Sequence, residues 1–129
     1  MKLSLVPTYV PLTLETSEGD IELVISKFTI QDAERRQALM SSVFDDKNAT
    51  ELDKYNSVQF ARIMCSVKHK DTGLYYWNKG IADFKSNGYE MDFINALAAA
   101  VDEVNPVFIP NTDENGKTEK ALDAKKKRS

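Results

Sequence analysis

The chain has 129 residues, the size of one domain and enough to bury a core. Charged residues make up 29% and hydrophobic residues 42%, as in ordinary soluble proteins, and the net charge is −3. A single cysteine excludes an internal disulfide and fits a reducing cytoplasm. No apolar run approaches the roughly 20 residues that span a bilayer, so no membrane contact is expected.

The first 26 residues are predicted to form an extended arm followed by a β-hairpin. Pro7 and Pro11 push the residues before them toward extended geometry, which makes 1–10 an arm. Apolar and polar residues then alternate over 12–26 on both sides of a turn-forming cluster at 17–20, the pattern of a hairpin. Because a lone hairpin is marginally stable, we expect subunit contacts at the arm and the hairpin edge.

Two helices are predicted after the hairpin. Thr29 is a typical N-cap for a helix that runs to about Phe44, and Thr50 for a helix that runs to about Lys68. The first helix is expected to leave Arg35, Arg36 and Gln37 in water and to bury Ile30, Ala33, Leu39, Met40, Val43 and Phe44. The second is expected to bury Leu52, Tyr55, Val58, Phe60, Ile63, Met64 and Val67.

The most regular helical pattern follows a turn at 71–73 and a short element, strand or helix, over 75–84. A helix is predicted up to Asn105, where Pro106 disfavours its continuation. Its apolar stripe consists of Met91, Ile94, Leu97, Ala98, Val101 and Val104. The aromatic residues ahead of it, with Trp77 at least partly buried, are expected to fill the core. If exposed, Tyr75, Tyr76 and Trp77 would instead be a partner-binding patch.

The fold expected from these elements is mainly α: three or four packed helices with an N-terminal β-hairpin and a disordered C-terminal tail. Residues 11–106 are expected to form a single mostly helical domain, and 107–129 a mobile charged tail. Residues 107–109 are apolar and are expected to tuck against the body. The tail has six basic and four acidic side chains, a net charge of +2, so the first 106 residues carry −5. An acidic body argues against a nucleic-acid surface.

Candidate chemical sites are weak, and we predict no catalytic, cofactor-binding or metal site. Cys65 and His69 are four residues apart on the predicted helix and could share a face, but no third ligand or orienting group is indicated. A calcium-loop pattern at 111–116 lacks the Glu required at its twelfth position, where Leu122 stands. Asn48 matches a glycosylation acceptor without a secretory signal. A Cys65-dependent enzyme stays open as a third class of function.

The order of elements resembles the tail assembly chaperone family of long-tailed bacteriophages. The similarity covers about residues 10–106 and is carried by PLTLETSEGDIELVISKFTIQDAERRQAL, YYWNKGIADFKSNGYEMDFINALAAAVDEVNP and the lysine-ending tail. The resemblance implies a mainly helical, self-associating protein without enzymatic activity or cofactor. Such a protein coats the hydrophobic tape measure protein and keeps it soluble until tube subunits polymerise around it. It would act in the host cell cytoplasm and be absent from the mature virion.

The resemblance also implies a longer, frameshifted form that recruits the tail tube protein. Lys125, Lys126 and Lys127 can be encoded by an adenine run on which a ribosome slips, so they are a candidate frameshift junction. A chain that ends two residues after such a run is expected for the in-frame product. The alternative function is a small cytoplasmic regulatory protein whose basic tail binds nucleic acid weakly.

Overall fold

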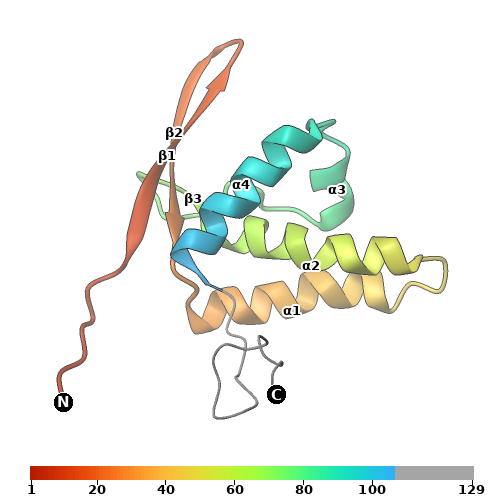
Figure 1. The fold of residues 1–129 in the computed structure, drawn as a ribbon, viewed down its shortest axis with the longest axis horizontal. Helices are drawn as coiled ribbons and strands as arrows, with labels where there is room; N and C mark the ends of the chain where they lie inside the picture. The colour runs from red at the N-terminus through yellow and green to blue at the C-terminus, as the bar shows by residue number, and fades with distance from the viewer. Residues whose placement is uncertain (107–129) are drawn as a thin grey trace, which may run out of the picture.

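The computed structural model of the chain describes residues 1–106, which form a small sheet packed on helices (Figure 1). The elements are β1 (Tyr9–Thr16), β2 (Gly19–Ser26), α1 (Ile30–Phe44), α2 (Glu51–Ser66), β3 (Val67–His69), α3 (Ile81–Lys85) and α4 (Met91–Val104). Helices α1 and α2 lie side by side as a helical hairpin, and α4 packs on α2 and β2. Within these residues there are four helices but also three strands, so the expected mainly α class is only partly confirmed.

The predicted hairpin is confirmed, with β1 antiparallel to β2 and Thr16 opposite Gly19. Gly19 has a φ of 122°, a conformation that a residue with a Cβ adopts only with strain. The Thr16 hydroxyl donates to the Gly19 carbonyl at 2.7 Å and closes the turn. The first strand begins at Tyr9, so it takes in the last residues of the predicted arm. Pro11 is tolerated there because β1 is an edge strand in the order β1-β2-β3.

The third strand, β3, was not expected, because the second helix was predicted to continue to Lys68. Helix α2 ends at Ser66, and β3 pairs with β2 so that Val67 lies opposite Ile25. On its other side β3 is hydrogen-bonded to the segment that follows the turn at 71–73, where His69 N donates to Leu74 O at 2.8 Å. The predicted short element over 75–84 therefore splits into a bridge at Tyr75 and the helix α3.

Both predicted N-caps are confirmed. Thr29 caps α1 and Thr50 caps α2, each in a capping box with an aspartate three residues later, Asp32 and Asp53 respectively. Each threonine hydroxyl accepts the aspartate amide, and each aspartate carboxylate accepts the threonine amide. These local hydrogen bonds fix where the helices begin before any tertiary contact forms.

The predicted burial of α1 is wrong, because a different face of the helix points toward the core. Asp32 is the residue that α1 buries fully, with 1% exposure, and the guanidinium-bearing Arg35 and Arg36, expected in water, are half-buried. Three residues expected in the core are exposed, whereas three others are half-buried: the exposed ones are Ile30, Ala33 and Phe44, and the half-buried ones are Leu39, Met40 and Val43. The prediction failed because charged residues were assigned to the solvent-exposed face, whereas the inward face of this helix carries charged side chains.

The hydrophobic core lies where β2, α2 and α4 meet. The stripe predicted for α4 is buried, apart from Met91, which is exposed at the first position of the helix. Trp77 is 6% exposed, which confirms its expected burial, and its indole N–H donates to the Tyr89 hydroxyl at 2.9 Å. The core is completed by Leu23, Ile25, Ile63, Met64, Val67, Ile81, Phe84, Ile94, Leu97, Ala98, Val101 and Val104.

A buried ionic network joins α1 to β3 and to the segment after it. The Asp32 carboxylate accepts hydrogen bonds from Lys68 Nζ at 2.8 Å, Tyr75 OH at 2.5 Å and Thr29 N at 2.9 Å. One turn later, the Arg35 guanidinium donates to backbone carbonyls, that of Met64 among them at 2.7 Å. Burial opposes ionisation of Asp32, but the three donors outweigh it and lower the pKa of the carboxyl.

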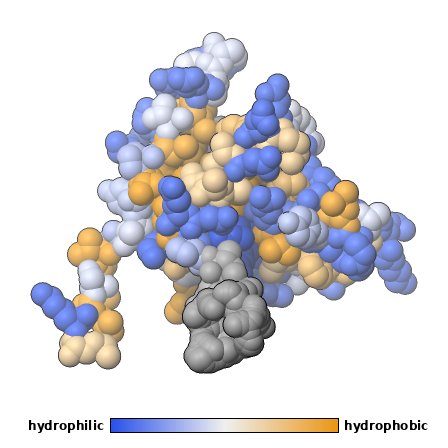
Figure 2. All heavy atoms as spheres, viewed as in Figure 1, coloured by the Kyte–Doolittle hydropathy of each residue, from blue (hydrophilic) through white to orange (hydrophobic). Residues whose placement is uncertain are grey.

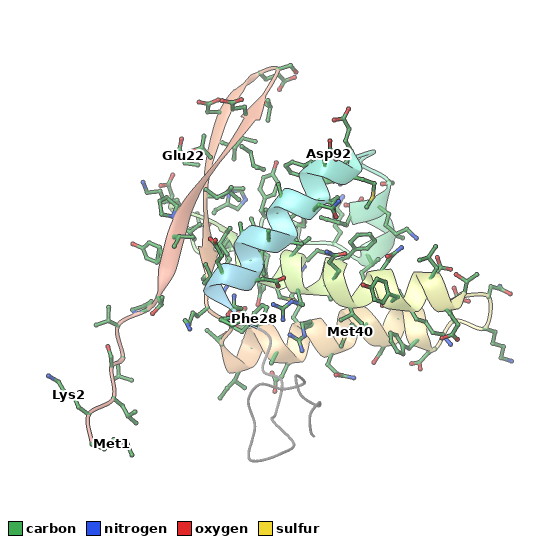
Figure 3. The ribbon with its side chains drawn as sticks, in the orientation of Figure 1. Met1, Lys2, Glu22, Phe28, Met40 and Asp92 are labelled. Atoms are coloured by element: carbon green, nitrogen blue, oxygen red, sulfur yellow. The ribbon has the colours of Figure 1, made fainter. Side chains whose placement is uncertain are left out.

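The C-terminal end of α4 is fixed by a second polar cluster around Asn105. Its side chain accepts from Phe28 N at 2.9 Å and donates to Ser26 O at 3.0 Å and to Ser66 Oγ at 3.2 Å. The Ser66 hydroxyl in turn donates to Ser26 O at 2.9 Å. Figure 3 shows Phe28 where the end of the hairpin meets the end of α4.

Replacing Asp32 with Asn should lower the free energy of unfolding by about 3–5 kcal/mol at pH 7, because Lys68 would keep its charge in a buried position without a carboxylate. The contribution of the carboxylate is fully present above the ordinary aspartate pKa of about 4. It is lost as the pH falls through the lowered pKa of the folded state. The wild-type advantage, measured by urea unfolding from pH 7 to about pH 2.5, should therefore shrink at the acid end.

Asp20→Asn, an exposed substitution in the hairpin, is the control and should change stability little at any pH. A stability difference for Asp32→Asn that is independent of pH would contradict the ionic role of this carboxylate.

Candidate protein-interaction surfaces

The predicted partner-binding residues Tyr75, Tyr76 and Trp77 occupy three different environments. Trp77 is in the core. The Tyr75 hydroxyl donates to Asp32, and burial together with that carboxylate raises the pKa of Tyr75 well above its ordinary value. Tyr76 is half-buried and lines a cleft of about 680 Å³ between β1 and the start of α4. The part of these residues in partner binding stays a prediction.

Cys65 and His69 do not share a helix face, because Cys65 lies in α2 and His69 in β3. Cys65 is fully buried, and an Arg35 guanidinium nitrogen lies 3.8 Å from its sulfur. Burial raises the pKa of the Cys65 thiol, and Arg35 offsets this only in part. His69 packs its ring edge-on against Tyr76. A protonated, buried thiol is a packing group and a poor nucleophile.

Among residues 1–106, no three or more His, Cys, Asp or Glu side chains gather into a group that could hold a metal ion. No helix in this part of the chain is both long and apolar enough to cross a membrane. Asn48 is exposed in the loop between α1 and α2. The calcium-loop pattern at 111–116 and the candidate frameshift junction at Lys125, Lys126 and Lys127 lie outside the described residues.

An apolar groove runs between α2 and α4. It has a volume of about 270 Å³ and is lined by Tyr55, Val58 and Ile63 from α2 and by Ala98 and Val101 from α4. The ion pair between Arg62 and Asp102, at 2.8 Å, lies toward the C-terminal ends of the two helices. The groove therefore has apolar walls and one charged, hydrogen-bonding end.

An exposed apolar stripe on α2 extends this groove along the helix. Leu52, Tyr55 and Val58 follow one another at three-residue steps, so they are neighbours on the helix surface. Tyr55 is 73% exposed and Leu52 is 66% exposed, although all three were predicted to be buried. That prediction was wrong because α1 and α4 cover only part of the broad apolar face of α2. The breadth of that face is the signal that could have indicated a binding surface.

The N-terminal arm is a second apolar surface. Leu3 is 85% exposed and Leu5 is 100% exposed, and Val6 and Tyr9 continue the series toward β1. The arm leads away from the body, with Met1 and Lys2 at its far end (Figures 1 and 3). Figure 2 shows the hydrophobic side chains of the arm standing apart from the rest of the molecule. Exposed apolar residues in such a series mark an interaction site.

In the native protein at pH 7.5, Cys65 should react with a thiol reagent at least about ten times more slowly than a surface cysteine, because it is buried and its thiol stays protonated. Colorimetric thiol titration with and without urea measures this rate. Leu74→Cys, at a position 66% exposed, supplies the surface control in the same chain. Equal rates at both positions in the folded protein would contradict the burial of Cys65.

No protein-family model matches the sequence, and no curated protein matches it. Among solved structures, the chain is similar to the tail assembly chaperone of bacteriophage HK97, with 14% sequence identity and a TM-score of 0.38. The alignment covers 75% of this chain and 87% of that chain. The neighbour is of the same kind as the family that the sequence resembles.

Proposed function

We propose that this chain is a tail assembly chaperone of a long-tailed bacteriophage, which binds the tape measure protein and keeps it soluble. The observation that carries the proposal is the apolar groove between α2 and α4, continued by the exposed stripe of Leu52, Tyr55 and Val58. Exposed apolar surface on a small acidic domain suits a protein that shields the apolar segments of another. The sequence resemblance over residues 10–106 supports the same role.

The groove suits an amphipathic helix of the partner. Such a helix presents apolar side chains at steps of three and four residues, and these would pack against Tyr55, Val58 and Val101. Burial of each exposed apolar side chain contributes roughly 1–2 kcal/mol before ordering costs are subtracted. The Arg62–Asp102 pair at the end of the groove could form hydrogen bonds with a polar residue of the partner.

Self-association would let several copies cover a long partner. The arm supplies apolar side chains, Leu3 and Leu5 among them, that another copy could bury. The edge strand β1, next to the arm, offers a further place for contact.

We propose that the chain also takes part in assembly of the tail. A longer form of the chain, diverging at Lys125, Lys126 or Lys127, would recruit tail tube protein to the tape measure protein already held by the body. In this role the chain acts without catalysis or cofactor in the host cell cytoplasm and leaves before the virion is complete.

Co-expression with the tape measure protein of the same phage tests the binding role. Wild-type chain should hold that protein in the supernatant after centrifugation and co-elute with it. Tyr55→Glu should reduce the soluble fraction several-fold, because it places a charge on the wall of the groove. Glutamate is a good helix former, so α2 should remain intact.

Leu74→Glu is the matched control, since Leu74 is exposed to a similar extent but lies in the loop after β3. It should leave the soluble fraction unchanged. A tape measure protein that stays insoluble beside the wild-type chain would overturn the proposed function. Equal loss in both variants would remove the groove as its site.

Light scattering should give a molar mass above the 14.5 kDa of one chain, rising with protein concentration. Leu5→Glu should lower the mass while leaving the folding transition unchanged, because Leu5 is fully exposed on the arm. Ile30→Glu, an exposed residue on α1, serves as control. A mass of 14.5 kDa at every concentration would contradict self-association.

A further inference from the structure

The cleft between β1 and the start of α4 has the free edge of a strand as one of its walls. This wall consists of four consecutive residues, Thr13, Leu14, Glu15 and Thr16, and the cleft has a volume of about 680 Å³. Successive residues of a strand point to opposite faces, so four in a row line a cleft where the backbone edge itself faces it. β1 is the outer strand in the order β1-β2-β3, and within residues 1–106 no other strand pairs with this edge.

The register of the hairpin shows which backbone groups of β1 point outward. Lys27 N donates to Thr8 O at 3.0 Å, so these two residues form a hydrogen-bonded pair that continues the pairing of β1 with β2. Hydrogen-bonded pairs alternate along antiparallel strands, and the backbone groups of the residues in between face away from β2. The residues in between are Tyr9, Pro11, Thr13 and Glu15. Pro11 has no N–H, so the outward donors beside the cleft are those of Thr13 and Glu15.

The opposite wall of the cleft is aromatic, and its rings are held in place. The rings of Tyr89 and Phe93 lie 5.0 Å apart between centroids, and the ring of Tyr76 lies 4.9 Å from that of Trp77. The Trp77 indole N–H donates to the Tyr89 hydroxyl at 2.9 Å. The three rings that line the cleft are half-buried, so each keeps part of its surface open. Open aromatic surface of this kind binds a cation or the aliphatic stem of a long side chain.

The two charged residues that line the cleft are both acidic. Glu15 belongs to β1, Glu90 directly precedes α4, and both side chains are exposed. Asp92, exposed in the first turn of α4, adds a negative charge nearby (Figure 3). Outward backbone groups fit an extended peptide, and aromatic rings next to carboxylates fit a lysine or arginine side chain.

We propose that this cleft binds an extended segment of a partner protein, which adds to the edge of β1 and places a lysine or arginine side chain over Tyr89 and Phe93. A volume of about 680 Å³ suits a short peptide. A second copy of β1 is a poor occupant, because symmetric pairing would bring two acidic clefts together and place Pro11 in the shared ladder. The residues that line this cleft are different from those of the α2–α4 groove, so it is a separate site.

The probe for this site is the synthetic peptide acetyl-Thr-Val-Arg-Val-Thr-amide, whose β-branched residues favour extended geometry. Trp77 is the only tryptophan and is hydrogen-bonded to Tyr89, so its fluorescence should change as the peptide is added. Glutamate in place of the arginine of the peptide should weaken binding at least about fivefold, because it loses the contact with the rings and meets like charge. Calorimetry gives the same affinities independently of the tryptophan.

Pairing with the strand edge is tested through the backbone of the peptide. Two versions carry N-methyl groups on alternate amides, so that one version blocks the donors that face β1 and the other blocks those that face away. One of the two should lose binding at least about fivefold, and the other should bind like the unmodified peptide. Equal binding of both versions would show that no ladder forms and would overturn the proposal.

Thr13→Pro removes an outward N–H and should weaken binding about fivefold. Thr13→Val loses the same side-chain hydroxyl but keeps the N–H, so it should bind like the wild type. Proline is tolerated at the outward positions of this strand, as Pro11 shows. Glu90→Gln should weaken binding of the arginine peptide about two- to threefold, whereas Glu34→Gln, an exposed substitution on α1, should leave it unchanged. Circular dichroism checks that each variant is folded.

An affinity for the arginine peptide that is equal to that for the glutamate peptide would overturn the proposal. Failure of millimolar arginine peptide to bind, by fluorescence and by calorimetry, would also overturn it. The same fluorescence change on raising the protein concentration without peptide would show that a second copy occupies the cleft, which contradicts the proposal as well. None of these measurements uses the tape measure protein, so their outcome is independent of the proposed function.

Discussion

The Asp32 carboxylate is the interaction on which the arrangement of the other elements depends. It accepts the Thr29 amide in the capping box of α1, pairs with Lys68 of β3 and accepts the Tyr75 hydroxyl, so one side chain joins three parts of the chain that are far apart in sequence. A buried charge tolerates little displacement from its partners, because any loss of contact leaves desolvation uncompensated. Helix α1 is thereby held in one position relative to the sheet and to the segment that carries Trp77.

This polar attachment has a consequence for the apolar surface of the molecule. The inward face of α1 is occupied in part by Asp32 and Arg35, which bond to polar groups of β3, of the segment after it and of the end of α2. On the other side, α4 packs against the second half of α2, where Ile63 is buried. Between them, the first half of α2 keeps Leu52, Tyr55 and Val58 at the surface. The same contacts that position the helices thus leave a hydrophobic stripe for another molecule.

Some features of the fold could be predicted from short sequence patterns, and others could not. Thr29 and Thr50 mark helix starts because their capping partners lie three residues away. The hairpin turn and the stripe of α4 are also short-range patterns. Strand β3 has three residues and takes its hydrogen bonds from β2 and from the segment after Gly73, so no pattern within it predicts a strand. The burial of Asp32 depends on Lys68 and Tyr75. These residues are far from Asp32 in the sequence and come close to it only in the folded chain, so no local pattern predicts the contact. The breadth of the apolar face of α2 could have indicated a binding surface, but the groove could not be located, because Tyr55 and Val58 have the same sequence pattern whether covered or exposed.

The hydrogen bonds of Asn105 make this residue part of the domain, although it lies beyond the last helix. A chain cut after Val104 would leave Phe28 N, Ser26 O and the Ser66 hydroxyl without this partner, at the junction of the sheet with α2. Arg62 would also lose the carbonyl it binds beside its pair with Asp102. A chain cut after Pro106 would retain every one of these contacts. The folded unit therefore needs at least the side-chain amide one residue beyond the last helix, and the chain that follows starts from an anchored point.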